Sequence, residues 1–166
     1  MNTAVFIDRD GVINNDEGCY YVYKPSDFKL NDGIIENICA LKMAGFIVVI
    51  ISNQGGIAKG LYKKEDTELL HNMLKERIKI LGCQIDEIYY CPHHPDVENC
   101  LCRKPDSLLI EKAIARFNID SNQSFFIGDS SRDIEAAEKV GIKGIQVYKN
   151  SNIKTICQSI IENSRK

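Results

Sequence analysis

Two acidic residues at the end of an apolar run are the first feature of the sequence that could do chemistry. In the segment VFIDRDGVIN, Asp8 and Asp10 follow the apolar residues 4–7, and Gly11 comes directly after them. Two residues apart on an extended chain, both side chains can face the same way. An ionised carboxylate is costly to bury without a partner. We therefore expect a cation to accompany these acids.

Alternating strands and helices must position the acids. Apolar runs and helical apolar spacing predict strands over 3–8, 46–52, 84–91, 124–129 and 143–148, and helices over 33–45, 63–82, 106–118, 131–141 and from Ile153 onward. Residues 11–30 are expected to form an irregular, flap-like excursion, and Asp106 or Ser107 to cap the helix that follows. This order predicts right-handed βαβ units around a parallel sheet, which binds ligands at the carboxyl ends of its strands.

The carboxyl ends of the later strands carry polar residues of matching chemistry. They are Ser52, Asn53, Gln54 and Lys59 after the second strand, Arg103 and Lys104 after the third, and Asp129 and Asp133 after the fourth. In a parallel sheet these groups share one rim with the first two acids. Several carboxylates there repel one another unless a hard cation such as Mg²⁺ lies among them. Hydroxyl, amide and ammonium groups around that cation suit the oxygens of a phosphoryl group.

A second metal site is predicted in the segment CPHHPDVENCLCRKP. Cys91, His93, Cys100 and Cys102 form a C-x-H…C-x-C set. Three thiolates and one imidazole make a closed tetrahedral Zn²⁺ site. Because such a site has no open position for a substrate, we expect a structural zinc that stiffens the zinc loop, residues 91–105.

Length and composition limit the class of protein. A chain of 166 residues, 44% hydrophobic and 27% charged, predicts one domain over 1–166. The net charge of −2 gives no reason to expect nucleic acid as a partner. No apolar stretch approaches a membrane span, and no signal peptide is evident. Seven cysteines, an odd number without a secretion signal, favour a reduced compartment, so the cytoplasm is expected.

Four motifs carry a family resemblance. DRDGVIN, ISNQGGIAKG, CRKP and GDSSRD, in this order, resemble the haloacid dehalogenase-like (HAD-like) phosphatases over nearly the whole chain. The most similar group within the family contains D-glycero-D-manno-heptose 1,7-bisphosphate 7-phosphatases and histidinol-phosphate phosphatases. The resemblance implies an α/β fold, a Rossmann-like three-layer sandwich with a central parallel sheet. The gaps between the motifs leave no room for a cap domain, so the excursion and the zinc loop must wall the site.

The resemblance also implies roles for the residues of these motifs. Asp8 would attack phosphorus and form an aspartyl-phosphate, and Asp10 would protonate the leaving oxygen and later activate water. Mg²⁺ would be held by Asp8, the backbone carbonyl of Asp10, and Asp129. Ser52 and Lys104 would bind the phosphoryl oxygens.

Two positions stay less defined. Asp133 is expected as an outer ligand of the Mg²⁺ site, with a local ion pair as the alternative. His94 competes with His93 for zinc, but the family pattern favours His93 and leaves His94 exposed or facing the substrate.

The same resemblance suggests which residues contact the substrate. These are Asp16, Glu17, Gly18 and Cys19 beside the sugar, Asn53, Gln54, Gly55 and Lys59 in the glycine-rich loop, and Arg103 and Ser130. The loop departs from the N-Q-S-G-I-A-R-G of the heptose group, since Gly55 replaces serine and Lys59 replaces arginine. Lysine keeps the charge but lacks the bidentate fork of arginine. Arg103 is therefore the stronger candidate for a phosphate at C1.

Taken together, these features predict an Mg²⁺-dependent monomeric phosphatase, with no nucleic-acid or membrane partner. Its substrate would be a small phosphorylated sugar, heptose 1,7-bisphosphate, cleaved at C7 on the way to nucleotide-activated heptose; the preferred anomer stays open. The first alternative is a histidinol-phosphate phosphatase, in which Asp16 and Glu17 would bind the amine. The second is a non-catalytic phosphosugar-binding module, against which Asp8 and Asp10 argue, because a binder needs no general acid.

Overall fold

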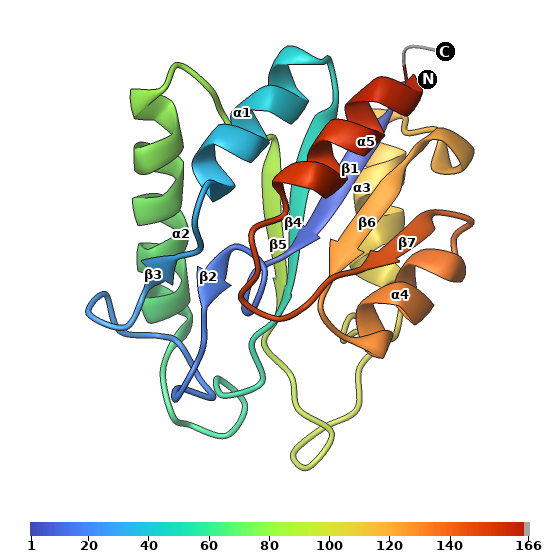
Figure 1. The fold of residues 1–166 in the computed structure, drawn as a ribbon. Coiled ribbons are helices and arrows are strands. Elements are labelled where there is room, and N and C mark those ends of the chain that lie inside the picture. The colour runs from blue at the N-terminus through green and yellow to red at the C-terminus, as the bar shows by residue number, and fades with distance from the viewer. Residues whose placement is uncertain (165–166) are drawn as a thin grey trace.

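A five-stranded parallel sheet forms the centre of the molecule (Figure 1). The computed structural model describes residues 1–164. Its strands are β1 (Ala4–Asp8), β4 (Ile47–Asn53), β5 (Glu87–Cys91), β6 (Phe125–Gly128) and β7 (Lys143–Gln146). They lie in the order β5-β4-β1-β6-β7, and each neighbouring pair is parallel. The strand that carries the first two acids is therefore the middle one.

Helices cover both faces of the sheet (Figure 1). They are α1 (Ile34–Met43), α2 (Lys64–Ile80), α3 (Leu108–Phe117), α4 (Ser131–Glu138) and α5 (Lys154–Ser164), with a short 3₁₀ turn at Ser121–Gln123. One hydrophobic cluster joins the sheet to α1, α2 and α5, and a second joins its other face to α3 and α4. This three-layer arrangement confirms the predicted fold class.

Side-chain alternation along β1 supplies both clusters. Val5 and Ile7 lie in the first cluster and Ala4 and Phe6 in the second, and all four are fully buried. Burying one large apolar side chain contributes about 1.5–3 kcal/mol to stability. Because β1 is packed on both faces, the backbone at its end, which carries Asp8, is held in a fixed position.

Element boundaries differ from the prediction in a few places. The strand expected over 84–91 begins at Glu87, because the Asp86 carboxylate takes the place of a strand partner and accepts the Val48 N–H at 2.7 Å. The excursion is not wholly irregular, since β2 (Asn14–Asn15) and β3 (Lys29–Leu30) pair antiparallel within it.

Ser107 occupies the N-cap position of α3, as predicted, but its side chain makes no capping hydrogen bond. The Ser107 hydroxyl donates instead to Glu111, one turn along the helix, at 2.6 Å. Asp106 forms an ion pair with Lys139 at 3.1 Å.

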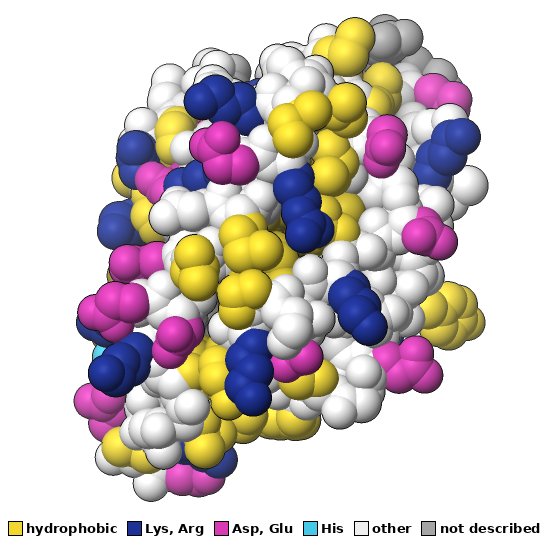
Figure 2. All heavy atoms as spheres, turned by 90° about the vertical axis from the view of Figure 1, so that its left-hand side faces the viewer, with side chains coloured by type: hydrophobic (Ala, Val, Ile, Leu, Met, Phe, Trp, Pro, Cys, Tyr) yellow, Lys and Arg dark blue, Asp and Glu magenta, His cyan; other side chains and the backbone are white. Residues whose placement is uncertain are grey.

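The carboxyl ends of the strands all point to one edge of the sheet, at the bottom of Figure 1, where the excursion and the zinc loop also lie. The face that carries α2 shows charges of both signs interspersed with hydrophobic side chains (Figure 2). Within residues 1–164, no helix has both the length and the apolar character that a membrane crossing requires.

Candidate active site

Three carboxylates and one ammonium meet at the carboxyl edge of the sheet. Oxygen atoms of Asp8, Asp129 and Asp133 lie within 4.8 Å of one another. They come from the end of β1, the end of β6 and the first turn of α4. The Lys104 Nζ lies 2.6 Å from one oxygen each of Asp8 and Asp133. Strand ends that are far apart in the sequence thus form one charged cluster.

The charges of this cluster are unbalanced. Burial raises the pKa of Asp8 well above its ordinary value, with Lys104 acting in the opposite direction. Burial and Asp133 likewise raise the pKa of Asp129. Burial alone would lower the pKa of Lys104, but Asp8 and Asp133 raise it, so the ammonium stays charged. One ammonium against three carboxylates leaves a deficit of positive charge that fits a bound Mg²⁺.

Asp133 caps helix α4 in addition to forming its ion pair with Lys104. Its Oδ2 accepts the N–H of Ser130 at 3.1 Å and the Ser130 hydroxyl at 2.8 Å, which forms the capping box of α4. Because Gly128 lacks a side chain, Asp133 can sit against it; a Cβ there would lie 2.3 Å from that of Asp133. Asp133 therefore makes the local ion pair, and both of its oxygens are engaged. Its expected position as an outer ligand stays a prediction.

The carboxylate of Asp10 is held by several donors. Gln54 Nε2 donates to its Oδ2 at 2.8 Å, and Asn14 Nδ2 donates to its Oδ1 at 3.0 Å. Tyr62 in turn donates to the Gln54 carbonyl at 2.6 Å. Arg9 donates to both oxygens of the carboxylate. These hydrogen bonds thus hold the side chain of Asp10 in one orientation at the wall of the cavity.

A cavity of about 350 Å³ opens beside these groups. The predicted site residues that line it are Asp8, Asp10, Asp16, Asn53, Gln54, Gly55, Arg103, Lys104, Asp129 and Ser130. Residues from the excursion, the glycine-rich loop, the zinc loop and the start of α4 therefore share one space.

Other predicted residues lie outside the wall of this cavity. Glu17 and Gly18 are exposed, and the Cys19 thiol donates to the Tyr21 carbonyl at 3.2 Å. Lys59 forms an ion pair with Asp96 at 3.1 Å. Ser52 is buried, and its hydroxyl accepts from Gln54 at 2.8 Å. At the end of β4 the wall consists of Asn53 and Gln54.

Gly55 makes room for Arg103. A Cβ at position 55 would lie 2.9 Å from Nη1 of Arg103 and 3.2 Å from the carbonyl oxygen of His93. That nitrogen donates to the same carbonyl at 3.1 Å. The absence of a side chain at Gly55 therefore decides where the guanidinium lies.

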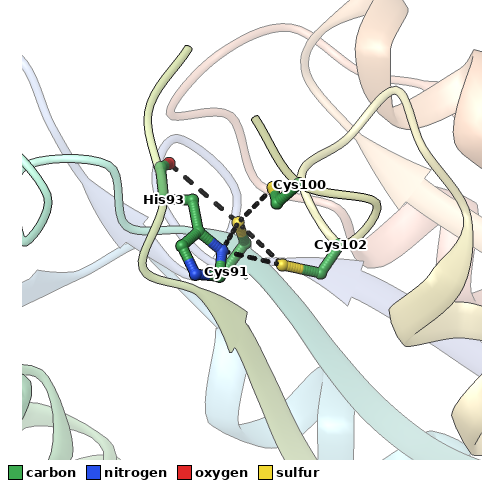
Figure 3. A group of neighbouring side chains, drawn as sticks. All are labelled: Cys91, His93, Cys100 and Cys102. Carbon is green, nitrogen blue, oxygen red and sulfur yellow. Dashed lines mark hydrogen bonds between the residues drawn. The ribbon is translucent and has the colours of Figure 1, made fainter. Parts of the chain in front are cut away.

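The cysteine and histidine side chains converge at the end of β5 (Figure 3). Sγ of Cys91 lies 3.1 Å from that of Cys102 and 3.6 Å from that of Cys100, and His93 Nδ1 lies 3.2 Å from the Cys102 sulfur. Zn–S bonds of about 2.3 Å place the sulfurs of a tetrahedral site roughly 3.8 Å apart. Burial alone would raise the pKa of Cys100, but backbone N–H groups of Cys102 and Arg103 lower it. The residues fit a bound metal.

Several residues of the cavity wall escaped prediction. Tyr62, Arg132 and Lys149 line it, and the Lys149 Nζ lies 2.8 Å from the Asp16 carboxylate. Lys149 follows the fifth strand, so the strand-end argument applied to that strand would have found it. Arg132 lies inside the motif GDSSRD. Tyr62 carries no such signal.

Comparisons with known proteins show which family this chain is similar to. The HAD-hydrolase-like family model matches residues 101–162. The D-glycero-beta-D-manno-heptose-1,7-bisphosphate 7-phosphatase of Photorhabdus laumondii is 41% identical over 84% of this chain and 78% of its own. The alpha-form enzyme of that organism is 37% identical over the same shares. The crystal structure of D,D-heptose 1,7-bisphosphate phosphatase from B. bronchiseptica, complexed with magnesium and phosphate, has a TM-score of 0.83 and 32% identity, covering 95% of this chain and 87% of that one.

Proposed function

Because this chain belongs to the HAD-like hydrolases, in the group of the heptose-1,7-bisphosphate 7-phosphatases, we propose that it removes the C7 phosphate of D-glycero-D-manno-heptose 1,7-bisphosphate. The observation that carries the proposal is the meeting of Asp8, Asp10 and Lys104 at one cavity. Two arginines that could bind a second phosphate, Arg103 and Arg132, line the same cavity. The relatives are named phosphatases, and both Asp8 and Asp10 line the cavity, which together argue against the non-catalytic binding module.

The proposed reaction uses Asp8, at the end of β1, and Asp10, two residues later, in turn. Asp8 attacks phosphorus, the bond between phosphorus and the C7 oxygen breaks, and Asp10 gives its proton to that oxygen. Water then attacks the aspartyl-phosphate, Asp10 takes the proton of the water, and inorganic phosphate leaves Asp8 free. Lys104 supplies positive charge to the phosphoryl oxygens. A Mg²⁺ held by Asp8, the Asp10 carbonyl and Asp129 would neutralise charge on the phosphoryl group.

The charges of the cavity wall favour a second phosphate on the substrate. Arg103 and Arg132 line the cavity, and no ion pair joins either to an acid in the part of the chain that the structure describes. Guanidinium groups bind phosphate through two parallel hydrogen bonds. We assign the C1 phosphate to this side of the cavity, with Arg103 as its main partner.

The other side of the cavity suits sugar hydroxyls. Asp16 is paired with Lys149, and its Oδ1 is buried without a hydrogen-bond partner among residues 1–164. The free oxygen of a paired carboxylate can accept a hydrogen bond from a hydroxyl group, whose desolvation costs less than that of a cation. The histidinol alternative needs an unpaired acid for the amine, and Glu17 lies outside the cavity wall. These contacts favour heptose bisphosphate over histidinol phosphate.

The remaining parts of the proposal concern zinc, location and assembly. The Cys₃His set would hold a structural Zn²⁺, since four protein ligands leave no position for a substrate. Its ligand Cys102 directly precedes Arg103 and Lys104, so the metal would stiffen the segment that presents both cations. We propose a cytoplasmic monomer consisting of one domain, testable by cell fractionation and light scattering.

Phosphate release tests the proposal directly. Both anomers of heptose 1,7-bisphosphate are compared with histidinol phosphate, with Mg²⁺ and with EDTA. We expect kcat/KM for one heptose anomer to exceed that for histidinol phosphate at least 100-fold, and all turnover to vanish in EDTA and return with Mg²⁺. Preference for histidinol phosphate would move the protein to the first alternative.

A further inference from the structure

A fully buried arginine, Arg9, lies between Asp8, the last residue of β1, and Asp10. Arg9 has no solvent exposure, and its Nη2 donates to Oδ1 of Asp10 at 2.9 Å while its Nε lies 3.2 Å from Oδ2. The two nitrogens thus grip both oxygens of the carboxylate. Burying a guanidinium is costly without strong partners, so this contact fixes both side chains. A fork of this kind restricts the rotation of the carboxylate far more than a single hydrogen bond does.

The far side of the guanidinium rests on a histidine of α2. Nη1 of Arg9 lies 3.4 Å from Nε2 of His71, which is buried. Burial and the charges of Arg9 and Lys75 lower the pKa of His71 to about 3. The ring is therefore neutral at physiological pH, and with its proton on Nδ1 it offers Nε2 as an acceptor.

The excursion completes the enclosure of the guanidinium. Nη2 of Arg9 also donates to the backbone carbonyl of Val22 at 2.7 Å, and the guanidinium lies 5.9 Å from the ring centre of Phe28. Val22 itself lines the cavity. Arg9 thus connects Asp10 to both α2 and the wall of the substrate cavity.

The two oxygens of Asp10 differ in their surroundings. Oδ1 accepts from Arg9 and Asn14, and both of those residues are fully buried. Oδ2 accepts from Nε of Arg9 at the longer distance of 3.2 Å and from Gln54, which lines the cavity. Oδ2 is therefore the oxygen that faces a substrate, and Oδ1 is the one that anchors the side chain.

We propose that Arg9 and His71 are positioning residues that hold the carboxyl group of Asp10 so that Oδ2 delivers its proton to the leaving oxygen. This inference rests on the proposed phosphatase function. Arg9 acts through its fork on Asp10, and His71 acts one step further away, by fixing the guanidinium. Neither residue touches the substrate or the phosphoryl group.

The test exploits the need of a leaving group for a proton. An aliphatic phosphate ester requires the proton of Asp10, whereas p-nitrophenyl phosphate releases a stable anion without one. The ratio of kcat/KM for the aliphatic ester to kcat/KM for p-nitrophenyl phosphate reports on the transfer of the phosphoryl group to Asp8, which is the step that needs the acid. Because both esters are measured on the same sample, the ratio does not depend on the fraction of protein that is folded.

Five substitutions separate positioning from structural support. Arg9→Lys keeps the charge but loses the fork, and His71→Leu removes the acceptor. His71→Gln restores an acceptor oxygen near the place of Nε2. Thr67→Val is the matched control, because Thr67 is buried one turn earlier on the same helix and its hydroxyl has no partner among the described residues. Asp10→Asn defines the largest change that loss of the acid can cause.

We expect Arg9→Lys and His71→Leu to lower the ratio about 10-fold or more, and Asp10→Asn about 100-fold or more. His71→Gln and Thr67→Val should leave the ratio within about threefold of the wild type. Equal losses on both esters, or a defect in His71→Gln as large as that in His71→Leu, would overturn the inference.

The assay also separates this inference from the proposed substrate. If the wild type prefers another aliphatic phosphate to heptose bisphosphate, the substrate assignment is wrong, and the same ratio measured with that ester still decides the roles of Arg9 and His71. If no aliphatic ester is hydrolysed while p-nitrophenyl phosphate is, both proposals are wrong.

Discussion

Asn53 and Lys104 are joined by two reciprocal hydrogen bonds. The side-chain amide of Asn53 donates to the Lys104 carbonyl at 3.0 Å, and its oxygen accepts the Lys104 N–H, also at 3.0 Å. The Lys104 Nζ in turn donates to the carbonyl of Ile51 at 2.9 Å. The end of β4 therefore holds both the backbone and the ammonium of Lys104. A residue of the zinc loop is thereby fixed against the carboxylate of Asp8.

Replacing Asn53 should separate the loop from the sheet. Asn53→Ala removes both hydrogen bonds, each with a net contribution of about 1 kcal/mol, so we expect a loss of about 2 kcal/mol in the free energy of unfolding and a roughly 10-fold lower kcat. Urea unfolding and steady-state kinetics check this. Asn72→Ala, on the exposed side of α2, is the control and should change neither quantity. A normal kcat would show that Lys104 finds its place without Asn53.

Asp8→Asn should abolish activity but raise the stability of the metal-free protein. The variant lacks the nucleophile, so turnover should fall at least 1000-fold. Because burial and Asp133 raise the pKa of Asp8, its negative charge is unfavourable when no cation is bound. We therefore expect the variant to have a higher Tm than the wild type in EDTA, and a smaller increase in Tm on addition of Mg²⁺. A lower Tm in EDTA would mean that the ion pair with Lys104 outweighs the repulsion.

Loss of the zinc should be distinguishable from loss of the magnesium. Cys100→Ser removes one ligand, and a Cys₂HisSer set binds Zn²⁺ more weakly. We expect less than one zinc per chain by metal analysis, a Tm lower by several degrees and reduced activity that added Mg²⁺ does not restore. Cys83→Ser is the control, since Cys83 precedes β5 and thus lies at the opposite end of that strand from the cysteine set. Full zinc content in Cys100→Ser would exclude it as a ligand.

Gly55→Ser should affect substrate binding more than chemistry. Its Cβ would lie 2.9 Å from Nη1 of Arg103, so the guanidinium must move. We expect KM for the bisphosphate to rise about 10-fold, with kcat within about twofold. Hydrolysis of p-nitrophenyl phosphate, which has no second phosphate, is the internal control. An unchanged KM would remove Arg103 from the binding of the C1 phosphate.

His71 should make the fold sensitive to acid. Its pKa is lowered from 6.5 to about 3 in the folded protein, so the unfolded chain binds a proton first as the pH falls. Stability is thus fully present above pH 6.5 and decreases between pH 6.5 and 3, by up to about 1.4 kcal/mol per pH unit. Urea unfolding at several pH values should show a shallower decline for His71→Gln. Parallel declines would mean that another group causes the sensitivity.

Much of the site was predictable because strand ends obey a simple rule. Asp8, Asp129 and Lys104 each follow a buried strand or its crossover, and parallel strands bring such positions to one edge. The cysteine set was equally predictable, since four ligands within one short segment need no distant partner. The sequence by itself therefore determined the fold class, the carboxyl-edge cluster and the Cys/His cluster that could hold a metal.

Side-chain partners were decided by the tertiary structure alone. His71 is an ordinary residue on an amphipathic helix until α2 packs beside Arg9, and Lys149 meets Asp16 only because the end of β7 faces the excursion. Lys59 has the right charge but is held by Asp96 of the zinc loop. Spacing along a chain fixes which edge or face a residue occupies. Which atoms meet there depends on the packing of elements that are distant in sequence, and no local pattern encodes that packing.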